Sequence, residues 1–192
     1  MPRPASYPRQ VDATTCGIAA LAVVAARSEA SPDYLGAGPE SIVRHQKALH
    51  VVASRVGMPW PRSLGTSPWA LARLASAATG RRYRSAIGRR LRAAIDRGLD
   101  HGDVFVYTGG GPQWWSRWIP RHVVAVLADG PDPRDGCYDV YEPSSGLIHR
   151  VDADGFLTGA AGGRAARGNW RRALLVLAPE PLREGPTRAC RR

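Results

Sequence analysis

The chain has 192 residues and carries 27 Lys and Arg against 16 Asp and Glu, which gives a formal net charge of +11. With 44% hydrophobic and 22% charged residues, its composition is that of a globular protein and excludes a wholly disordered chain. No apolar run approaches the roughly 18–20 residues that cross a bilayer. A length near 100–200 residues favours one domain. We expect it to span residues 10–180, between an extended lead-in at 1–9 and a basic tail at 181–192.

The first half of the chain predicts helices. Their expected ranges are residues 16–27, 39–56, 67–80 and 87–99. Thr14 or Thr15 is suited to cap the first of them, and glycines are suited to end the others.

After Gly102 the sequence changes to short apolar runs that are typical of strands. Strands are predicted at residues 103–107, 122–127, 137–142, 147–151 and 172–178, with a short helix near 152–161. A helical half followed by a mostly antiparallel sheet is an α+β arrangement.

Three cysteines, Cys16, Cys137 and Cys190, are too few and too scattered for a disulfide scaffold or a zinc site. We therefore expect no metal and no cofactor. An odd count fits a reducing compartment with at least one free thiol. The apolar stretch at 18–26 follows two arginines, as in a signal peptide, but Asp12 interrupts that pattern. We expect a cytoplasmic protein, with secretion without a leader left open.

The segment from Gln10 to Gly17 carries the strongest chemical signal. Its sequence, QVDATTCG, places Cys16 in the first turn of a predicted helix, where backbone N–H groups and the helix dipole favour a thiolate. A thiolate that attacks a carbonyl creates an oxyanion, which the Gln10 side-chain NH₂ and the Cys16 backbone N–H could stabilise. Gly17 would let substrate, or another part of the chain, approach closely beside the nucleophile, so we expect it in the substrate-binding region.

A nucleophilic thiolate needs an imidazole and a third group that orients the ring. His122 begins an apolar predicted strand, and Glu142 ends the next one. If these strands form a hairpin centred near Asp132, residues 122 and 142 lie directly opposite each other, with Cβ atoms about 4.5–5.5 Å apart. Asp139 is the competing carboxylate, but it lies about 10 Å along the strand and points to the other face. The sequence therefore favours Glu142 as the partner of His122.

Three tryptophans, Trp114, Trp115 and Trp118, stand in the loop before His122. As structural residues they would cover the sheet edge and exclude water from the imidazole. As binding residues they would form one wall of a substrate groove, on a loop hinged at a run of glycines. We expect packing to be the larger role, with Trp115 and Trp118 also contacting substrate.

Together these residues resemble those of a papain-like cysteine peptidase: Gln-x₅-Cys-Gly at a helix start, a His that begins a buried strand, and an acidic residue before a Pro. They are most similar to the bacteriocin-processing peptidases, which cleave double-glycine leader peptides, and to stand-alone relatives of these, over Gln10 to about Pro179. The resemblance implies a papain-like fold with the nucleophile helix packed on the sheet. It also implies Cys16 as nucleophile, His122 as general base and acid, and Gln10 in the oxyanion hole. The family usually has Asp where this chain has Glu142, which leaves the ring orientation open.

The resulting hypothesis is a cysteine hydrolase that cleaves a peptide or amide bond through an acyl-enzyme and a Cys-His-Glu triad. Two alternatives share the fold. One is an inactive peptide-binding module, which Glu in place of Asp favours, and the other is a transglutaminase-like acyltransferase. No exporter domain accompanies the sequence, so we do not expect the leader-peptide substrate. The expected partner is a peptide or protein substrate, and the positive charge favours an acidic one; the oligomeric state is left open.

The densest charge on the chain is the arginine run at residues 81–92. It could track phosphates, and Tyr83 could stack on a base. No sequence signature of a nucleic-acid-binding motif accompanies the run, and such runs are commonly solvated helix faces. We therefore favour an acidic protein partner or an anionic envelope polymer over nucleic acid for this surface.

Overall fold

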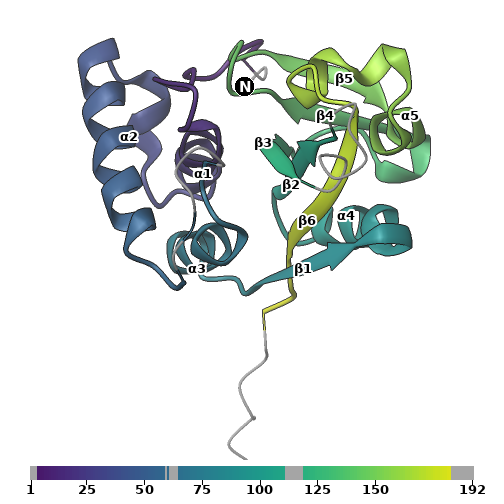
Figure 1. Cartoon of the computed structure of the whole chain (residues 1–192), viewed down its shortest axis with the longest axis horizontal. Coiled ribbons are helices and arrows are strands. Elements are labelled where there is room, and N and C mark those ends of the chain that lie inside the picture. Colours follow the sequence, from purple (N-terminus) through teal and green to yellow (C-terminus); the bar gives the residue numbers. More distant parts are fainter. Residues whose placement is uncertain (1–3, 59, 61–64, 111–118, 183–192) are drawn as a thin grey trace, which may run out of the picture.

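The computed structural model describes residues 4–58, 60, 65–110 and 119–182. Over these residues the chain forms a six-stranded sheet in the order β1-β6-β2-β3-β4-β5, with every neighbouring pair antiparallel (Figure 1). The strands are β1 (Tyr83–Ile87), β2 (Val104–Gly109), β3 (Pro120–Val126), β4 (Cys137–Tyr141), β5 (Ile148–Asp152) and β6 (Arg172–Pro179). The helices are α1 (Cys16–Arg27), α2 (Pro39–Ser54), α3 (Pro68–Thr79), α4 (Leu91–Leu99) and α5 (Ala153–Thr158). The predicted α+β class is confirmed.

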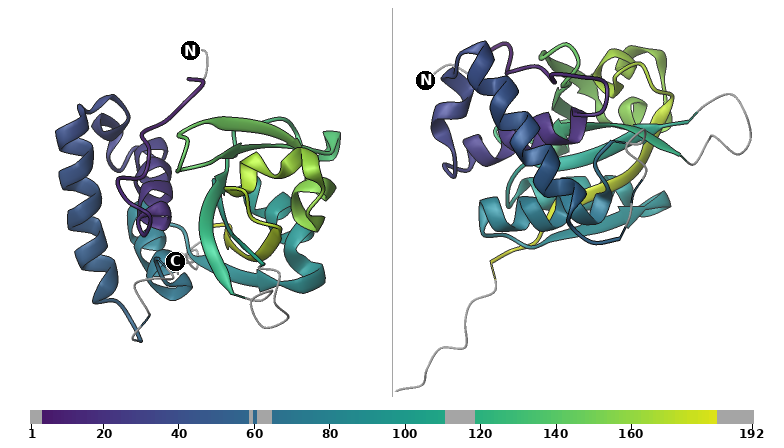
Figure 2. Two further views of the ribbon diagram at one scale, coloured as in Figure 1. Left: turned by 45° about the horizontal axis from the view of Figure 1, so that its top comes forward. Right: turned by 60° about the vertical axis from the view of Figure 1, so that its left-hand side comes forward.

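Helices cover both faces of the sheet (Figures 1 and 2). α1 and α3 pack on one face, with α2 outside them, and α4 and α5 pack on the other. The alternation of side chains along β2 separates the two cores. Phe105 and Tyr107 belong to the core under α1, whereas Val104 and Val106 belong to the core under α4.

The first helix is buried almost all round. Every residue from Cys16 to Ala26 is buried, because α1 is enclosed by the sheet, α2 and α3. A helix that is apolar on all sides is typical of a protein core. α1 therefore accounts for the apolar stretch at 18–26, and its bounds are the predicted ones. Neither α1 nor any other helix within the described ranges is long and apolar enough to cross a bilayer.

The sequence prediction gave no element at residues 83–86 and was wrong for residues 87–90. It began a helix at Ile87, whereas β1 extends up to Ile87, a 3₁₀ turn follows at Gly88–Arg90, and α4 begins at Leu91. The sequence of β1, YRSAI, has no clear alternation of apolar and polar residues. Its hydrogen-bonding partner is β6, which lies about 90 residues later in the sequence, so no local pattern could have indicated the strand.

Candidate active site

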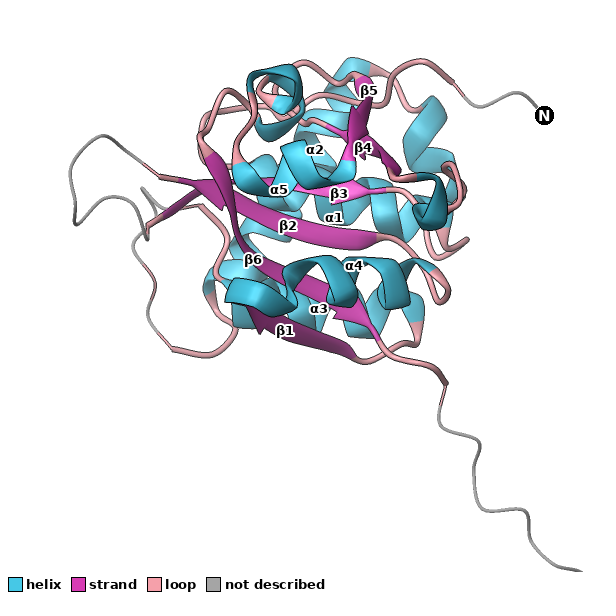
Figure 3. Ribbon diagram, turned by 90° about the vertical axis from the view of Figure 1, so that its right-hand side faces the viewer, coloured by secondary structure: helices cyan, strands magenta, loops and turns pink. Residues whose placement is uncertain are grey.

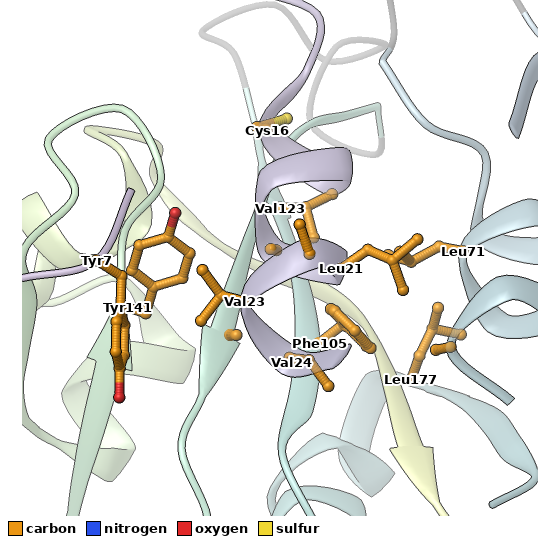
Figure 4. Packing of buried hydrophobic residues seen from close by; sticks show 14 of the residues in the cluster. Tyr7, Cys16, Leu21, Val23, Val24, Leu71, Phe105, Val123, Tyr141 and Leu177 are labelled. Carbon is orange, nitrogen blue, oxygen red and sulfur yellow. The ribbon is translucent and has the colours of Figure 1, made fainter. Parts of the chain in front are cut away.

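Cys16 lies at the N-terminal end of α1, above the side chains of the core (Figure 4). Thr15 occupies the N-cap position, but its hydroxyl donates to the Asp12 carbonyl oxygen at 3.0 Å and does not cap the helix. The predicted hydroxyl cap is therefore wrong. Because Thr15 leaves them uncapped, the N–H groups of the first turn remain beside the thiol. Cys16 itself is 2% exposed.

His122, in β3, lies between Cys16 and Glu142. Its Nε2 is 2.7 Å from Glu142 Oε1, and the ring lies close enough to Cys16 for that residue to raise its pKa. Since Nε2 faces the carboxylate, Nδ1 is the ring nitrogen that faces the thiol. A carboxylate without a proton can only accept, so Nε2 carries the proton of this bond. Three of the residues singled out in the sequence thus come together.

The bond between His122 and Glu142 does not arise from direct cross-strand pairing. In the β3–β4 ladder Ala125 lies opposite Tyr141. This register places residue 142 opposite Val124, so the centre of the hairpin is one residue beyond the predicted one. Positions 122 and 124 share a face, and a diagonal neighbour lies about 7–8 Å away. Glutamate, with one methylene more than aspartate, suits that longer reach.

The other carboxylate of β4 is engaged elsewhere. Asp139 lies opposite Arg150 in the β4–β5 ladder, and its Oδ1 accepts from Arg150 Nε at 2.9 Å. The carboxylate that meets His122 is Glu142, the one that the sequence favours.

The turn that follows β4 fixes the Glu142 carboxylate. The backbone N–H groups of Ser144 and Ser145 donate to its two oxygens, each at 2.8 Å. Burial alone would raise the pKa of Glu142, but the bonds from His122 and from the two serine N–H groups outweigh it and lower the pKa to about 2. Glu142 is therefore a buried carboxylate that stays charged at neutral pH.

The pKa of His122 moves in the other direction. Burial alone would lower it, but the hydrogen bonds to Cys16 and Glu142 outweigh burial and raise the pKa from 6.5 to about 9. The ring is consequently protonated at neutral pH. In that state it can donate a proton to a leaving group that approaches Cys16.

Gln10 lies in an extended strap, residues 8–11, that precedes α1. Its side-chain NH₂ donates to the Asp12 carbonyl oxygen at 2.9 Å, and its Oε1 accepts from Ser144 Oγ at 3.2 Å. Its backbone N–H donates to the Pro143 carbonyl oxygen at 2.8 Å, so the strap is tied to the turn that holds Glu142. No hydrogen bond among the described residues joins Gln10 to the thiol. A primary amide has two N–H groups, and one remains here beyond the bond to Asp12.

A buried glutamine that the sequence analysis did not single out holds this strap from the other side. Gln46, in α2, is 0% exposed, and its Oε1 accepts from the Val11 N–H at 3.1 Å. Its Nε2 donates to the Arg9 carbonyl oxygen at 2.8 Å and to the Tyr34 hydroxyl at 2.9 Å. These bonds fix both neighbours of Gln10. The only sequence signal was a polar residue at a helix position with apolar neighbours one turn away.

Two glycines permit close packing at the site. A Cβ on Gly17 would lie 2.9 Å from Cβ of Thr66, so another part of the chain approaches closely beside Gly17, which is one of the two roles expected for this glycine. A Cβ on Gly168, whose φ is +62°, would lie 2.6 Å from His122 Nε2. Gly168 therefore packs against the ring nitrogen that bonds Glu142, a role that the sequence analysis missed.

Arg167, which precedes Gly168, holds the turn that contains this glycine. Arg167 is 1% exposed, and burial together with nearby Arg164 lowers its pKa. Its guanidinium donates to the carbonyl oxygens of Gly155, Phe156, Ala160 and Trp170. These bonds hold the turn against α5 and so keep Gly168 in place.

A small pocket of about 30 Å³ lies between the end of α2 and residues 65–67. Gly65, one of its lining residues, packs near the thiol: a Cβ on Gly65 would lie 3.7 Å from Cys16 Sγ. Trp60 Nε1 and Thr66 Oγ1, from two of its lining residues, are buried and have no hydrogen-bond partner within the described chain.

Trp115 and Trp118, expected to bind substrate, lie outside the described residues, as does Trp114. No group of three or more His, Cys, Asp or Glu in the described part could hold a metal ion.

Comparison with known proteins adds a likeness of fold. No protein-family model matches the chain, and no curated protein matches its sequence. Among solved structures, the chain is similar to a protein from Bacillus anthracis that is itself only provisionally assigned as a C39-like peptidase. The superposition covers 92% of this chain and 95% of the other, with a TM-score of 0.53 and 11% sequence identity. The two chains share a fold. At this identity the likeness concerns the fold alone.

Proposed function

We propose that the chain is a cysteine hydrolase that cleaves a peptide or amide bond through Cys16, His122 and Glu142. One observation carries the proposal: the buried imidazole of His122 lies beside the thiol at the start of α1 and bonds a carboxylate at 2.7 Å. The likeness of fold to a C39-like peptidase supports the same class. Within that class, the motif around Cys16 favours a stand-alone relative of the bacteriocin-processing peptidases. The net charge of +11 favours an acidic peptide or protein substrate.

In the first step Cys16 is the nucleophile. The proton of the thiol resides on Nδ1 of His122 when the sulfur attacks the carbonyl carbon of the substrate. Negative charge then moves to the carbonyl oxygen. The Cys16 backbone N–H, in the uncapped first turn of α1, and the remaining N–H of Gln10 stabilise that oxyanion.

In the next steps His122 moves the protons. Nδ1 gives its proton to the leaving nitrogen, the C–N bond breaks, and a thioester to Cys16 remains. Water attacks the thioester, Nδ1 takes a proton from it, and the sulfur leaves as the acid product forms. Glu142 keeps Nε2 protonated and the ring oriented throughout. An amine in place of water would give acyl transfer, which the mass of the product distinguishes from hydrolysis.

Alkylation of the thiols tests the nucleophile. We expect iodoacetamide to modify Cys16 faster than the more exposed Cys137 at neutral pH, as read by peptide mapping. The variant His122→Ala should remove this advantage and abolish cleavage of a peptide library. If Cys16 reacts no faster than Cys137, and His122→Ala changes neither rate, the hydrolase proposal fails.

The burial of Cys16 favours one alternative, a module that binds peptides without turnover. The residue is 2% exposed, and the amide of Gln10 is already bonded to Asp12. In that case Cys16→Ala should bind peptides as tightly as the wild type, and the wild type should cleave none of them. Cleavage by the wild type that is lost in Cys16→Ala, with binding retained, would exclude this alternative.

A further inference from the structure

The arginine run singled out in the sequence lies along an open edge of the sheet. β1 stands at one end of the strand order, and among the described strands it pairs only with β6 (Figure 3). Residues 81–90 contain five arginines and no acidic residue. Glu180 is 2.5 Å from Arg84 Nε and 3.9 Å from Arg82 Nε, so one carboxylate serves two of the five.

The register shows which backbone groups of β1 face outward. The Glu180 N–H donates to the Arg82 carbonyl oxygen, and Arg84 lies opposite Ala178. Because hydrogen-bonded pairs alternate along an antiparallel ladder, the even-numbered residues of β1 bond β6. The N–H and C=O of Ser85 and the N–H of Ile87 therefore point away from the sheet.

The side chains along this edge are solvent-exposed and include an apolar one. Ser85 is exposed, and Ile87 is 65% exposed. Arg89 and Arg90, in the turn that follows, are also exposed. The edge thus offers two backbone N–H donors, an apolar side chain and a cluster of cations.

We propose that the β1 edge binds an extended acidic segment of a partner protein, which adds to the sheet as a further strand. The backbone groups of Ser85 and Ile87 pair with that segment, and Arg89 and Arg90 face its carboxylates. Arginines on an edge strand repel the equally basic edge of a second copy of this chain, and the same charges attract an acidic strand. None of these residues belongs to the Cys16 site, so this inference does not depend on the proposed hydrolase.

Nucleic acid fits the edge less well. Tyr83, the aromatic residue within the run, is buried, and its hydroxyl donates to the Asp103 carbonyl oxygen at 3.0 Å, so it cannot stack on a base. A phosphodiester backbone carries no N–H to pair with the outward carbonyl of Ser85. A peptide backbone supplies both donors and acceptors at strand spacing.

Binding of a fluorescein-labelled peptide, Glu-Val-Glu-Val-Glu-Val, tests the pairing by fluorescence anisotropy. The variant Ser85→Pro removes an outward N–H that β6 does not use, a place where edge strands tolerate proline. We expect it to bind the peptide about tenfold more weakly than the wild type, while Ser85→Ala, which keeps the N–H, binds normally. A peptide of equal charge with Pro at the central Val should bind the wild type as weakly.

Charge reversal separates the arginines of the edge from the general charge of the chain. Arg89→Glu with Arg90→Glu should weaken binding by about tenfold or more, whereas Arg44→Glu with Arg55→Glu, exposed on and just after α2, should leave it nearly unchanged. Equal loss in both double variants, or equal binding of the proline-containing peptide, would overturn the proposal. The proposal would also be overturned if a single-stranded oligonucleotide displaced the peptide and bound Ser85→Pro and the wild type with equal affinity.

Discussion

The imidazole of His122 is confined by a residue that has no side chain. Gly168 has a φ of +62°, which favours glycine, and the place of its missing Cβ is 2.6 Å from Nε2. The buried guanidinium of Arg167 donates hydrogen bonds to backbone carbonyl oxygens and so fixes the turn from the other side. The position of Nε2 against Glu142 therefore depends on a turn that follows α5, far from His122 in the sequence.

The variant Gly168→Ala tests this confinement. An alanine with positive φ costs about 1–2 kcal/mol wherever it stands, so Gly80→Ala, at φ +69° with open space around it, is the matched control. Both variants should lower the free energy of unfolding in urea. Only Gly168→Ala should also slow the alkylation of Cys16, because its methyl group displaces the ring. Equal alkylation rates in the two variants would show that Gly168 has no influence on His122.

At this scale the sequence was informative about residue types and less so about distances. The start of a predicted helix indicated Cys16, and the start of a predicted strand indicated His122. The alternation of side chains along the next strand favoured Glu142 over Asp139. The register of β3 and β4 could not be read from the turn, since one residue more or less in the loop shifts it. Gly168 and Gln46 were missed because their partners come from elements distant in the sequence.

The elements assemble the site through the strap at residues 8–11. Gln46 bonds the strap from α2, and the turn after β4 bonds it through Pro143 and Ser144. A single short segment thus joins the helical side of the molecule to the turn that holds Glu142. The buried α1 was predictable from its apolar run, but this connection depends on three elements meeting and has no local signature.

The variant Gln46→Leu separates the strap from the nucleophile. It leaves the Val11 N–H and the Arg9 carbonyl without their partner, which should cost about 2–4 kcal/mol in the free energy of unfolding. Because the lost bonds hold the two neighbours of Gln10 and none of them holds Cys16, turnover should fall while the alkylation rate of Cys16 stays near that of the wild type. Tyr34→Phe, which removes one partner of Gln46 but keeps the two strap bonds, is the control and should retain turnover. A parallel loss of alkylation and turnover in Gln46→Leu would contradict a specific role for the strap.

For the whole molecule, the buried pair makes stability depend on pH at both ends. The pKa of Glu142 is lowered from 4.5 to about 2, so its contribution is complete above pH 4.5 and is lost as the pH falls through 2. The pKa of His122 is raised from 6.5 to about 9, so its contribution is complete below pH 6.5 and is lost as the pH rises through 9. Both contributions are complete only between these limits. The net charge of +11 adds a repulsion that grows as carboxylates are protonated, which is why a variant is a better reference than the absolute stability.

The variant Glu142→Gln supplies that reference. Between pH 4.5 and 6.5 it should unfold with a free energy about 3 kcal/mol below that of the wild type, because a buried charged ring loses its carboxylate. The difference should shrink below pH 4.5, where the unfolded chain protonates Glu142 while the folded wild type keeps it charged down to about pH 2. It should shrink again above pH 6.5, where the unfolded chain releases the proton of His122 that the folded wild type keeps up to about pH 9. Urea unfolding at closely spaced pH values measures the difference while the charge of the remaining surface cancels. A difference that stays constant from pH 2 to 9 would mean that the bond between His122 and Glu142 carries no charge pairing, and would remove the basis for a protonated general acid at neutral pH.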